Sequence, residues 1–367
     1  MFNPEVLVRS HIRSMPAYEP ILPFEVLSEK LKRPASEIIK LDANENPYGP
    51  LAIVKDTLSQ LAHPHIYPDP QSRQLREALA EFHRVPAENI LVGAGADELI
   101  DLTIRLLVEP GDAILNFPPT FGMYAFDADL NRARVITIPR TTDFHLDEKA
   151  IESTLEREKP VLAFLAQPNN PDGGLLPGRL IDWILQFPVI VVLDEAYIQF
   201  SAGGSSWLEE VISRKNLIVL RTFSKWAGLA GLRVGYGVFP DELMPHLWKI
   251  KQPYNVSVAA SAAAYASLQN AEQLHAITAK IVAERERLFS CLRDISYLQP
   301  FPSQANFILC KVIGRQAAEL KTALAQRGIL VRYFNKPGLR QYIRISVGKP
   351  EYTDVLTTAL HDLEANP

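Results

Sequence analysis

Six short runs of mostly apolar residues constrain the fold of this chain more than any other feature of its sequence. They occupy residues 113–115, 135–138, 161–165, 189–193, 217–220 and 234–238. Most runs are apolar at successive rather than alternate positions, so the strands that they form need cover on both faces. A largely parallel sheet between two layers of helices provides that cover, and the predicted class is therefore α/β.

The amino-acid composition of the sequence changes twice along the chain. Ten of the 28 prolines lie in the first 70 residues, which predicts an extended arm with short helices rather than part of a sheet. After about residue 245, an alanine-rich helical region precedes a mixture of short strands and helices, which indicates a separate α+β domain. We therefore expect an N-terminal arm at residues 1–40, packing with the small domain or a partner subunit. A large domain at 41–248 and a small domain at 249–367 follow.

Length, charge and cysteine content exclude several classes of protein. A chain of 367 residues allows two domains, at about 150 residues per domain. The formal net charge of −4 gives no basic surface for nucleic acid, and no run of about 18 apolar residues could cross a membrane. Cys291 and Cys310 are too few for a disulfide scaffold or an all-cysteine zinc site. The beginning of the chain lacks the features of a secretory signal, so we expect a cytoplasmic protein without a metal.

Asp194 and Lys225 form the strongest chemical signal. Each follows an apolar strand, and the carboxyl ends of neighbouring parallel strands open onto one crevice. A carboxylate there needs a cationic or metal partner, and a desolvated lysine can become a nucleophile that forms a Schiff base. Taken by themselves, these two residues are more typical of a salt bridge at the sheet rim.

Other residues add a phosphate site to the same crevice. The segment 93–98 follows a strand and opens a helix, where backbone N–H groups attract an anion. Arg233 could complete the phosphate site, although alone it is more typical of a surface ion pair. Asn169 or Asn170 could present an amide, although their segment also reads as a proline-glycine turn. Pyridoxal 5′-phosphate meets all these requirements, because it has one phosphate, a ring nitrogen that needs a carboxylate and an aldehyde that binds a lysine.

These residues belong to a series of motifs that covers nearly the whole chain. The sequence resembles the fold type I pyridoxal-phosphate aminotransferases, and within them the histidinol-phosphate aminotransferase family. The resemblance implies a large domain with a mostly parallel seven-stranded sheet between helices, plus a smaller α+β domain. The motifs occupy residues 41–48, 67–69, 93–98, 118–124, 168–171, 194–197, 222–225, 230–233 and 343–348.

The resemblance implies a role for each matching residue. Lys225 would carry the Schiff base, Asp194 would pair with the pyridine nitrogen, and Tyr197 would complete the catalytic set. The implied cofactor-binding residues are Lys225, Asp194, Tyr197, Asn170, Ala94, Gly95, Phe121, Thr222, Ser224 and Arg233, joined by Tyr67 from the other subunit of a homodimer. The implied substrate-binding residues are Arg344 for a carboxylate, Arg332 and Tyr18 for a phosphate, and Asn46.

The family reaction exchanges an amino group between L-histidinol phosphate and 2-oxoglutarate, which gives imidazole-acetol phosphate and L-glutamate in histidine biosynthesis. This chain departs from the family pattern at three positions. Phe121 replaces a tyrosine that stacks on the cofactor ring, Asp172 replaces a threonine, and Ile21 replaces a glycine in the arm. The first change keeps the stacking but loses a hydroxyl, and the second should alter only a turn. The third leaves the placement of the arm open.

Two other enzyme activities and one non-enzymatic role are alternatives. The same scaffold could serve an aminotransferase for aromatic amino acids or a threonine-phosphate decarboxylase, and a phosphate grip at Arg332 does not tell phosphorylated amines apart. A regulator that senses pyridoxal phosphate would need a DNA-binding module. The segment before residue 41 is too short for such a module, and the charge of the chain is wrong for it.

Overall fold

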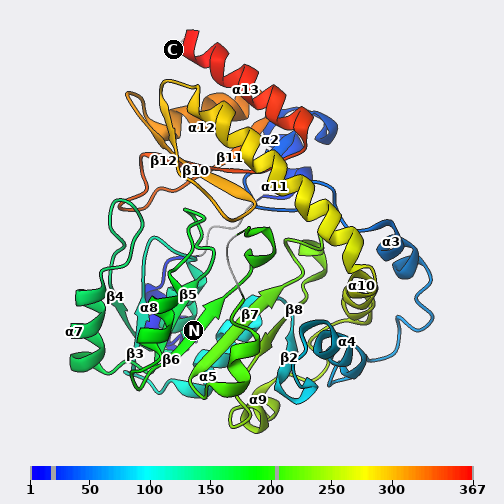
Figure 1. Ribbon diagram of the computed structural model, residues 1–367, viewed down its shortest axis with the longest axis vertical. Coiled ribbons are helices and arrows are strands. Elements are labelled where there is room, and N and C mark those ends of the chain that lie inside the picture. The colour runs from blue at the N-terminus through cyan, green and yellow to red at the C-terminus, as the bar shows by residue number, and fades with distance from the viewer. Residues whose placement is uncertain (1, 18–21, 203–205, 366–367) are drawn as a thin grey trace.

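The larger of the two sheets has seven mostly parallel strands, which confirms the expected fold. The computed structural model describes residues 2–17, 22–202 and 206–365. Strand order is β2-β8-β7-β6-β5-β3-β4, and β8 runs antiparallel to both of its neighbours (Figure 1). The strands are β2 (Ile90–Gly93), β3 (Ala113–Asn116), β4 (Arg134–Thr137), β5 (Leu162–Ala166), β6 (Ile190–Asp194), β7 (Leu217–Thr222) and β8 (Gly235–Val238).

Helices cover both faces of this sheet, which explains why its strands are apolar at successive positions. Val192 of β6 packs in one cluster with Leu99 of α5, while its neighbour Leu193 packs in another cluster with Ile181 of α8. Each buried aliphatic side chain of this kind contributes about 1.5–3 kcal/mol. The helices are α4 (Arg73–His83), α5 (Ala96–Leu107), α6 (Met123–Leu130), α7 (Glu148–Glu158), α8 (Gly178–Ile184) and α9 (Met244–Ile250).

The smaller sheet lies beside the carboxyl-end edge of the large one, in the order β1-β11-β12-β10-β9 (Figure 1). Its C-terminal strands are β9 (Leu298–Pro300), β10 (Phe307–Val312), β11 (Ile329–Tyr333) and β12 (Tyr342–Ser346), and its helices are α11 (Ala271–Arg293), α12 (Ala317–Gln326) and α13 (Pro350–Ala365). The alanine-rich α10 (Val258–Gln269) packs on α3 (Ala52–Ser59) and α4 instead of on this sheet.

None of the described helices is both long enough and apolar enough to cross a membrane. Short 3-10 turns are η3 (Ala87–Asn89), η4 (Ile198–Phe200), η5 (Glu209–Ser213) and η6 (Ala230–Leu232).

The N-terminal region contributes a strand, so the expectation that it takes no part in a sheet was wrong. β1 (Ile39–Leu41) pairs in parallel with β11. Residues 39–41 lie in a stretch without proline between Pro34 and Pro47, so their N–H groups are available for pairing. The short helices are as expected: η1 (Pro4–Leu7), α1 (Ser10–Ser14), α2 (Phe24–Leu31) and η2 (Ala35–Glu37).

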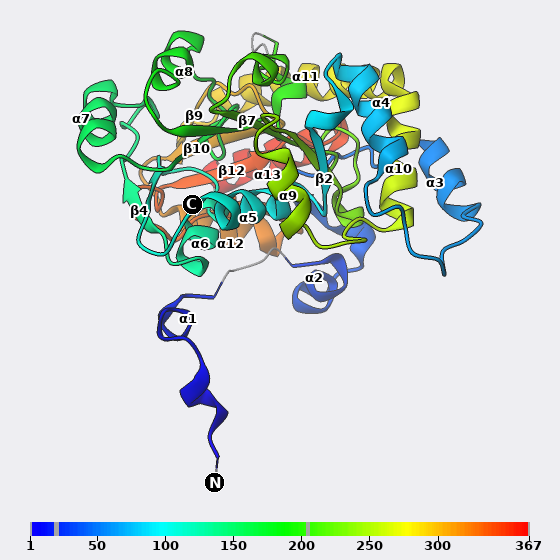
Figure 2. The same cartoon turned by 90° about the horizontal axis from the view of Figure 1, so that it is seen from below.

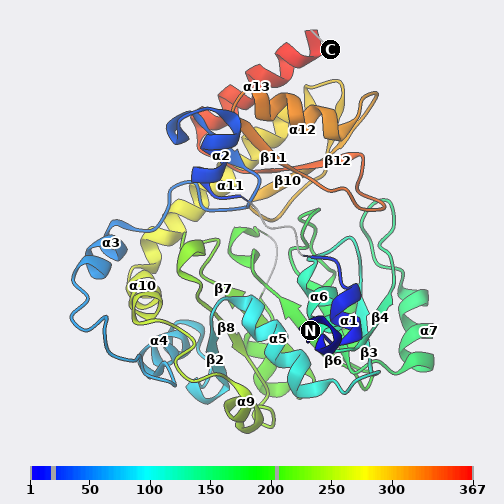
Figure 3. The same cartoon turned by 180° about the vertical axis from the view of Figure 1, so that it is seen from behind.

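The two helices of the arm lie on different parts of the molecule. His11 Nε2 of α1 lies 3.3 Å from the carbonyl oxygen of Leu130 in α6, on the face of the large sheet that Figure 3 presents. Leu27 of α2 packs with Leu330 of β11 in the small sheet. The segment before α1 extends away from the body of the protein (Figure 2). The proposed boundaries at residues 40 and 248 stay predictions.

Candidate active site

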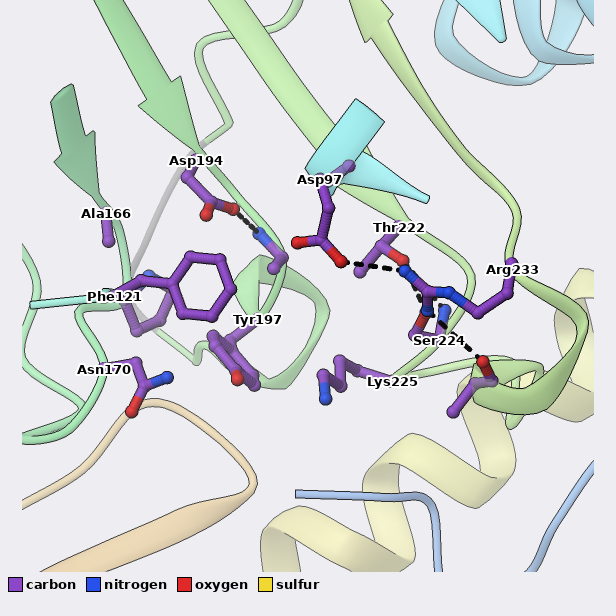
Figure 4. A pocket seen from close by; sticks show the side chains of 14 residues that line it. Asp97, Phe121, Ala166, Asn170, Asp194, Tyr197, Thr222, Ser224, Lys225 and Arg233 are labelled. Carbon is purple, nitrogen blue, oxygen red and sulfur yellow. Dashed lines mark hydrogen bonds and ion pairs between the residues drawn. The ribbon is translucent and has the colours of Figure 1, made fainter. Parts of the chain in front are cut away.

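A cavity opens where three parallel strands of the large sheet end. Ala166, Asp194 and Thr222 are the last residues of β5, β6 and β7, and all three side chains line this first cavity (Figure 4). The other lining residues are Ala96, Asp97, Phe121, Pro168, Asn170, Ala196, Tyr197, Ser224, Lys225, Ala230 and Arg233. The strand ends therefore bring Asp194 and Lys225 to one cavity.

Asp194 presents a buried carboxylate that is already held from two sides. Its Oδ1 accepts a hydrogen bond from the backbone N–H of Ala196 at 3.0 Å, and its Oδ2 accepts one from the hydroxyl of Tyr124 at 2.6 Å. Burial raises the pKa of this carboxyl, while the two hydrogen bonds lower it. A cationic partner in the cavity would favour the charged form further.

Lys225 follows β7 on the opposite side of the cavity. Its Nζ donates to the carbonyl oxygen of Ala43 at 3.2 Å and lies 5.9 Å from the centre of the Tyr197 ring. The hydroxyl oxygen of Tyr197 accepts a hydrogen bond from Asn44 Nδ2 at 3.1 Å. That bond leaves the hydroxyl hydrogen of Tyr197 available as a donor.

Hydroxyl groups and a guanidinium gather at another side of the first cavity. Arg233 Nη2 forms an ion pair with Asp97 at 2.8 Å, and its Nη1 donates to Ser224 Oγ at 3.4 Å. Thr222 Oγ1 donates to Ser224 Oγ at 2.9 Å and accepts from the Ser224 backbone N–H at 3.0 Å. This donor set suits a phosphate group.

Glycine at position 95 makes room for that guanidinium. Gly95 has a φ of +85°, and a Cβ atom there would lie 2.5 Å from Arg233 Nη2. A Cβ atom at Gly235 would lie 2.7 Å from the backbone nitrogen of Ala96. The start of α5, strand β8 and Arg233 therefore meet at a distance that side chains at these two glycines would prevent.

A second, larger cavity adjoins the first and shares four lining residues with it: Phe121, Asn170, Tyr197 and Lys225. Arg332 of β11 and Arg344 of β12 also line it. Arg344 Nη1 donates to Asn170 Oδ1 at 2.6 Å, and Nη2 donates to the carbonyl oxygen of Asp42 at 2.8 Å. The small sheet thus contributes two guanidinium groups beside Lys225.

The turn after β5 holds Asn170 in place. Asp172 accepts hydrogen bonds from the backbone N–H of Gly174 at 2.8 Å and from the Asn169 amide. Asn169 in turn accepts from the hydroxyl of Thr120 at 2.7 Å. Asp172 therefore connects the turn to the loop before Phe121 as well as closing it, whereas the sequence predicted an effect on the turn alone.

Some of the expected site residues lie outside these two cavities. The Asn46 amide is bonded to backbone atoms of Trp226 and Tyr48. Tyr67 is 78% exposed and stacks on Tyr254, at 4.6 Å between ring centres. Ala94 donates its N–H to Glu98 at 2.6 Å. Tyr18 lies outside the described residues, and the roles of all these residues stay predictions.

Sequence reasoning missed three residues that the structure places at the site. Tyr124 holds Asp194, Asp97 pairs with Arg233, and Asn44 holds Tyr197. Each one lies inside a motif that carried the family resemblance. Their types gave no distinguishing signal, because an aromatic residue on a helix reads as core and an acidic residue in a first helical turn reads as a favourable charge.

Comparison with known proteins places this geometry in a family. The model of the family described as aminotransferase class I and II matches residues 36–360. Histidinol-phosphate aminotransferase 1, chloroplastic, of Arabidopsis thaliana is 53% identical over 354 residues, covering 96% of this chain and 85% of that protein. The histidinol-phosphate aminotransferase of Roseiflexus castenholzii is 48% identical over 97% of this chain and 98% of its own. The crystal structure of histidinol-phosphate aminotransferase from Sinorhizobium meliloti in complex with pyridoxal-5′-phosphate superposes with a TM-score of 0.87. It is 29% identical and covers 96% of this chain and 97% of that one.

The fold, the strand-end cavity and the family match define a pyridoxal-phosphate-dependent aminotransferase of class I and II. The resemblance that the sequence motifs indicated is thereby confirmed. Within this class, the chain belongs to the histidinol-phosphate aminotransferase family.

The residues at the first cavity fit pyridoxal 5′-phosphate. The backbone at Gly95 and Gly235 has no room for side chains. Beside it lie the hydroxyl and guanidinium donors that a phosphate requires. The buried Asp194 carboxylate offers oxygen lone pairs to a ring nitrogen, and Lys225 offers an amine. The aromatic ring of Phe121 lines the same cavity (Figure 4).

Proposed function

We propose that this chain exchanges an amino group between L-histidinol phosphate and 2-oxoglutarate, giving imidazole-acetol phosphate and L-glutamate in histidine biosynthesis. One observation carries the choice of substrates. Among the described residues that line the second cavity there is no carboxylate, whereas five are cationic: Arg140, Lys225, Arg332, Lys336 and Arg344. Such a cavity favours anions, and both proposed substrates are anionic.

Lys225 and Asp194 have the principal roles in this proposal. When bound, pyridoxal phosphate supplies an electron sink for cleavage of a bond at the substrate α-carbon. Lys225 would hold the cofactor aldehyde through Nζ and would be placed to move the α-proton of the substrate. Asp194 keeps the ring nitrogen protonated. The Ala43 carbonyl, 3.2 Å from Nζ, supports the orientation of the lysine.

The remaining contacts orient the cofactor and the substrates. Tyr197 and Asn170 donate to the ring hydroxyl, and the Asn44 bond supports that direction for Tyr197. Thr222, Ser224 and Arg233 bind the cofactor phosphate. The backbone N–H groups of Ala94 and Gly95 donate to Glu98 and to the carbonyl oxygen of Gly93, so their contact with the phosphate stays a prediction. Arg344 binds the carboxylate of glutamate or 2-oxoglutarate, since a guanidinium fork matches a carboxylate. Arg332, with Tyr18, binds the phosphate of histidinol phosphate, and a substrate contact by Asn46 stays a prediction.

The working assembly in this proposal is a homodimer. Tyr67 is exposed and stacked on Tyr254 at the surface, away from both cavities of its own chain. That exposure supports the idea that Tyr67 completes the phosphate site of a partner subunit. Location in the cytoplasm stays a prediction.

A spectrum and three half-reactions test the proposal. The purified protein should be yellow, and Lys225→Ala should remove the absorption band and lower turnover by about 10²–10⁴-fold. Lys215→Ala is the matched control, because Lys215 pairs with Glu242 at the surface. Histidinol phosphate should react faster than phenylalanine or threonine phosphate. Faster reaction with either of the last two would reject the proposed substrate and leave the cofactor assignment in place.

A further inference from the structure

Tyr124 of α6 is a buried tyrosine whose hydroxyl donates to Asp194 Oδ2 at 2.6 Å. The role proposed above for Asp194 requires a carboxylate that stays charged and keeps one orientation. We propose that Tyr124 is a positioning residue, which fixes the orientation and the charge of the Asp194 carboxylate toward the cofactor ring nitrogen. The inference rests on the proposed function and adds a residue to it.

Packing holds the Tyr124 ring in one place. Its side chain has no exposed surface, and its ring stacks on Phe164 of β5 at 4.9 Å with an angle of 11° between the planes. Burial and the neighbouring Asp194 raise the pKa of the Tyr124 hydroxyl. The phenol therefore remains protonated and acts as a fixed donor at the strand end.

The two donors to Asp194 leave capacity for a third. A carboxylate has about four lone-pair sites, and the Ala196 N–H and the Tyr124 hydroxyl use one on each oxygen. The side chain lines the first cavity, so a cationic N–H there can reach a remaining site. Tyr124 thus restrains the carboxylate without blocking it.

Tyr124 also opposes the environment that would neutralise Asp194. Burial has the largest effect in raising the pKa of Asp194, and the charges of Asp97 and Glu195 act in the same direction. Glu195 is itself paired with Arg221 at 2.9 Å, and Lys225 lies across the cavity. Among the interactions that lower the pKa of Asp194, the hydrogen bond from Tyr124 has the largest effect.

The same tyrosine supports a wall of the cofactor cavity. The Phe121 ring meets the Tyr124 ring edge-on, at 5.6 Å between centres and 80° between planes. A phenylalanine at position 124 would keep both ring contacts and remove only the hydroxyl. The Tyr124→Phe variant therefore separates the hydrogen bond from the packing.

Cofactor binding as a function of pH tests the proposal on the full-length holoenzyme. Tyr124→Phe should weaken binding of pyridoxal phosphate about 10-fold, the effect of one hydrogen bond to a charged group. The pH below which the cofactor absorption is lost should rise, since Asp194 would become protonated at higher pH. The kcat should fall, while the KM for histidinol phosphate should stay unchanged. Tyr297→Phe is the control, because Tyr297 donates a buried hydrogen bond to Leu360 at 2.8 Å in the small-sheet region.

A double mutant tests whether the Tyr124 hydroxyl acts through the charge of Asp194. In an Asp194→Asn background, adding Tyr124→Phe should change cofactor binding little, because the charge that the hydroxyl stabilises is gone. Wild-type cofactor binding and pH dependence in Tyr124→Phe would overturn the inference alone, as would equal losses in Tyr124→Phe and Tyr297→Phe. A wild-type protein that binds no pyridoxal phosphate would overturn the proposed function as well.

Discussion

Arg344 Nη1 donates to Asn170 Oδ1 at 2.6 Å, which joins the small sheet to the loop after β5 of the large sheet. The same guanidinium donates to the carbonyl oxygen of Asp42, just after β1. Arg344 is buried, and two acceptors fix its plane. An arginine held in this way loses little conformational freedom when it binds a carboxylate.

Arg344→Lys should raise the KM for 2-oxoglutarate and glutamate about 10-fold. Lysine keeps the charge but loses the fork that binds two oxygens at once. Histidinol phosphate has no carboxylate, so its half-reaction should change less. Separate half-reaction kinetics measure both effects. Arg340→Lys, at an exposed position in the segment before β12, serves as the control.

Arg332→Ala should raise the KM for histidinol phosphate by about 10-fold or more, because a charged hydrogen bond to the phosphate is lost. A phosphate-free amine such as phenylalanine should show little change with the same variant. The ratio of kcat/KM for the two amines is the measurement. An equal fall for both amines would contradict the assignment of Arg332 to the phosphate.

Gly95→Ala should lower the affinity for pyridoxal phosphate about 10-fold or more. The added Cβ would lie 2.5 Å from Arg233 Nη2, so the guanidinium has to move. Gly111→Ala is a matched control, since Gly111 also has a positive φ, of +100°, but open space where the Cβ would lie. It should cost about 1 kcal/mol of stability and leave cofactor affinity unchanged. Titration of cofactor-free protein with pyridoxal phosphate distinguishes the two variants.

Asp194→Asn should stabilise the cofactor-free protein at neutral pH. Burial raises the pKa of Asp194 in the folded protein above its unfolded value. Its contribution to stability is therefore fully present below the unfolded pKa and is lost as pH rises through the folded pKa. In thermal unfolding, the variant should have a higher Tm than the wild type at pH 7. This difference in Tm should become smaller as the pH falls. Asp56→Asn, on the exposed face of α3, should have the same Tm as the wild type at each pH.

Mixing two inactive variants should restore activity if Tyr67 acts across a dimer interface. Tyr67→Ala chains keep Lys225, and Lys225→Ala chains supply an intact Tyr67 to the partner. If subunits exchange randomly at equal concentrations, about half of the dimers are mixed. One of the two sites in each mixed dimer then has both Lys225 and an intact Tyr67, which is about a quarter of all sites. Activity after mixing, compared with each variant alone, is the measurement. A fully active monomer by light scattering would contradict the assembly.

The sequence predicted the large sheet well because burial on both faces leaves a readable pattern. Val191, Val192 and Leu193 alternate between two core clusters, and only a covered strand needs apolar residues at all three positions. β1 was missed because the high proline content of its region outweighed a three-residue stretch without proline. Its partner β11 lies near the other end of the chain, and local sequence carries no record of such a pairing.

For the site, the rule that ligands bind at the carboxyl ends of parallel strands was enough to bring Asp194 and Lys225 together. It could not find Tyr124, because a buried aromatic residue on a helix has the same pattern whether or not its hydroxyl serves a carboxylate. The motif that contains Asn46 suggests a substrate contact, and its amide is bonded to the backbone of Trp226 and Tyr48. The role of Asn46 stays a prediction.

The pairing of β1 with β11 has a consequence for the order in which the chain folds during synthesis. All seven strands of the large sheet lie between residues 90 and 238, so they can assemble while the ribosome is still producing the remainder. Ile39 can pair with Ile329 only after more than three quarters of the chain has been made between them. A strand of only three residues offers little edge to a wrong partner during that delay.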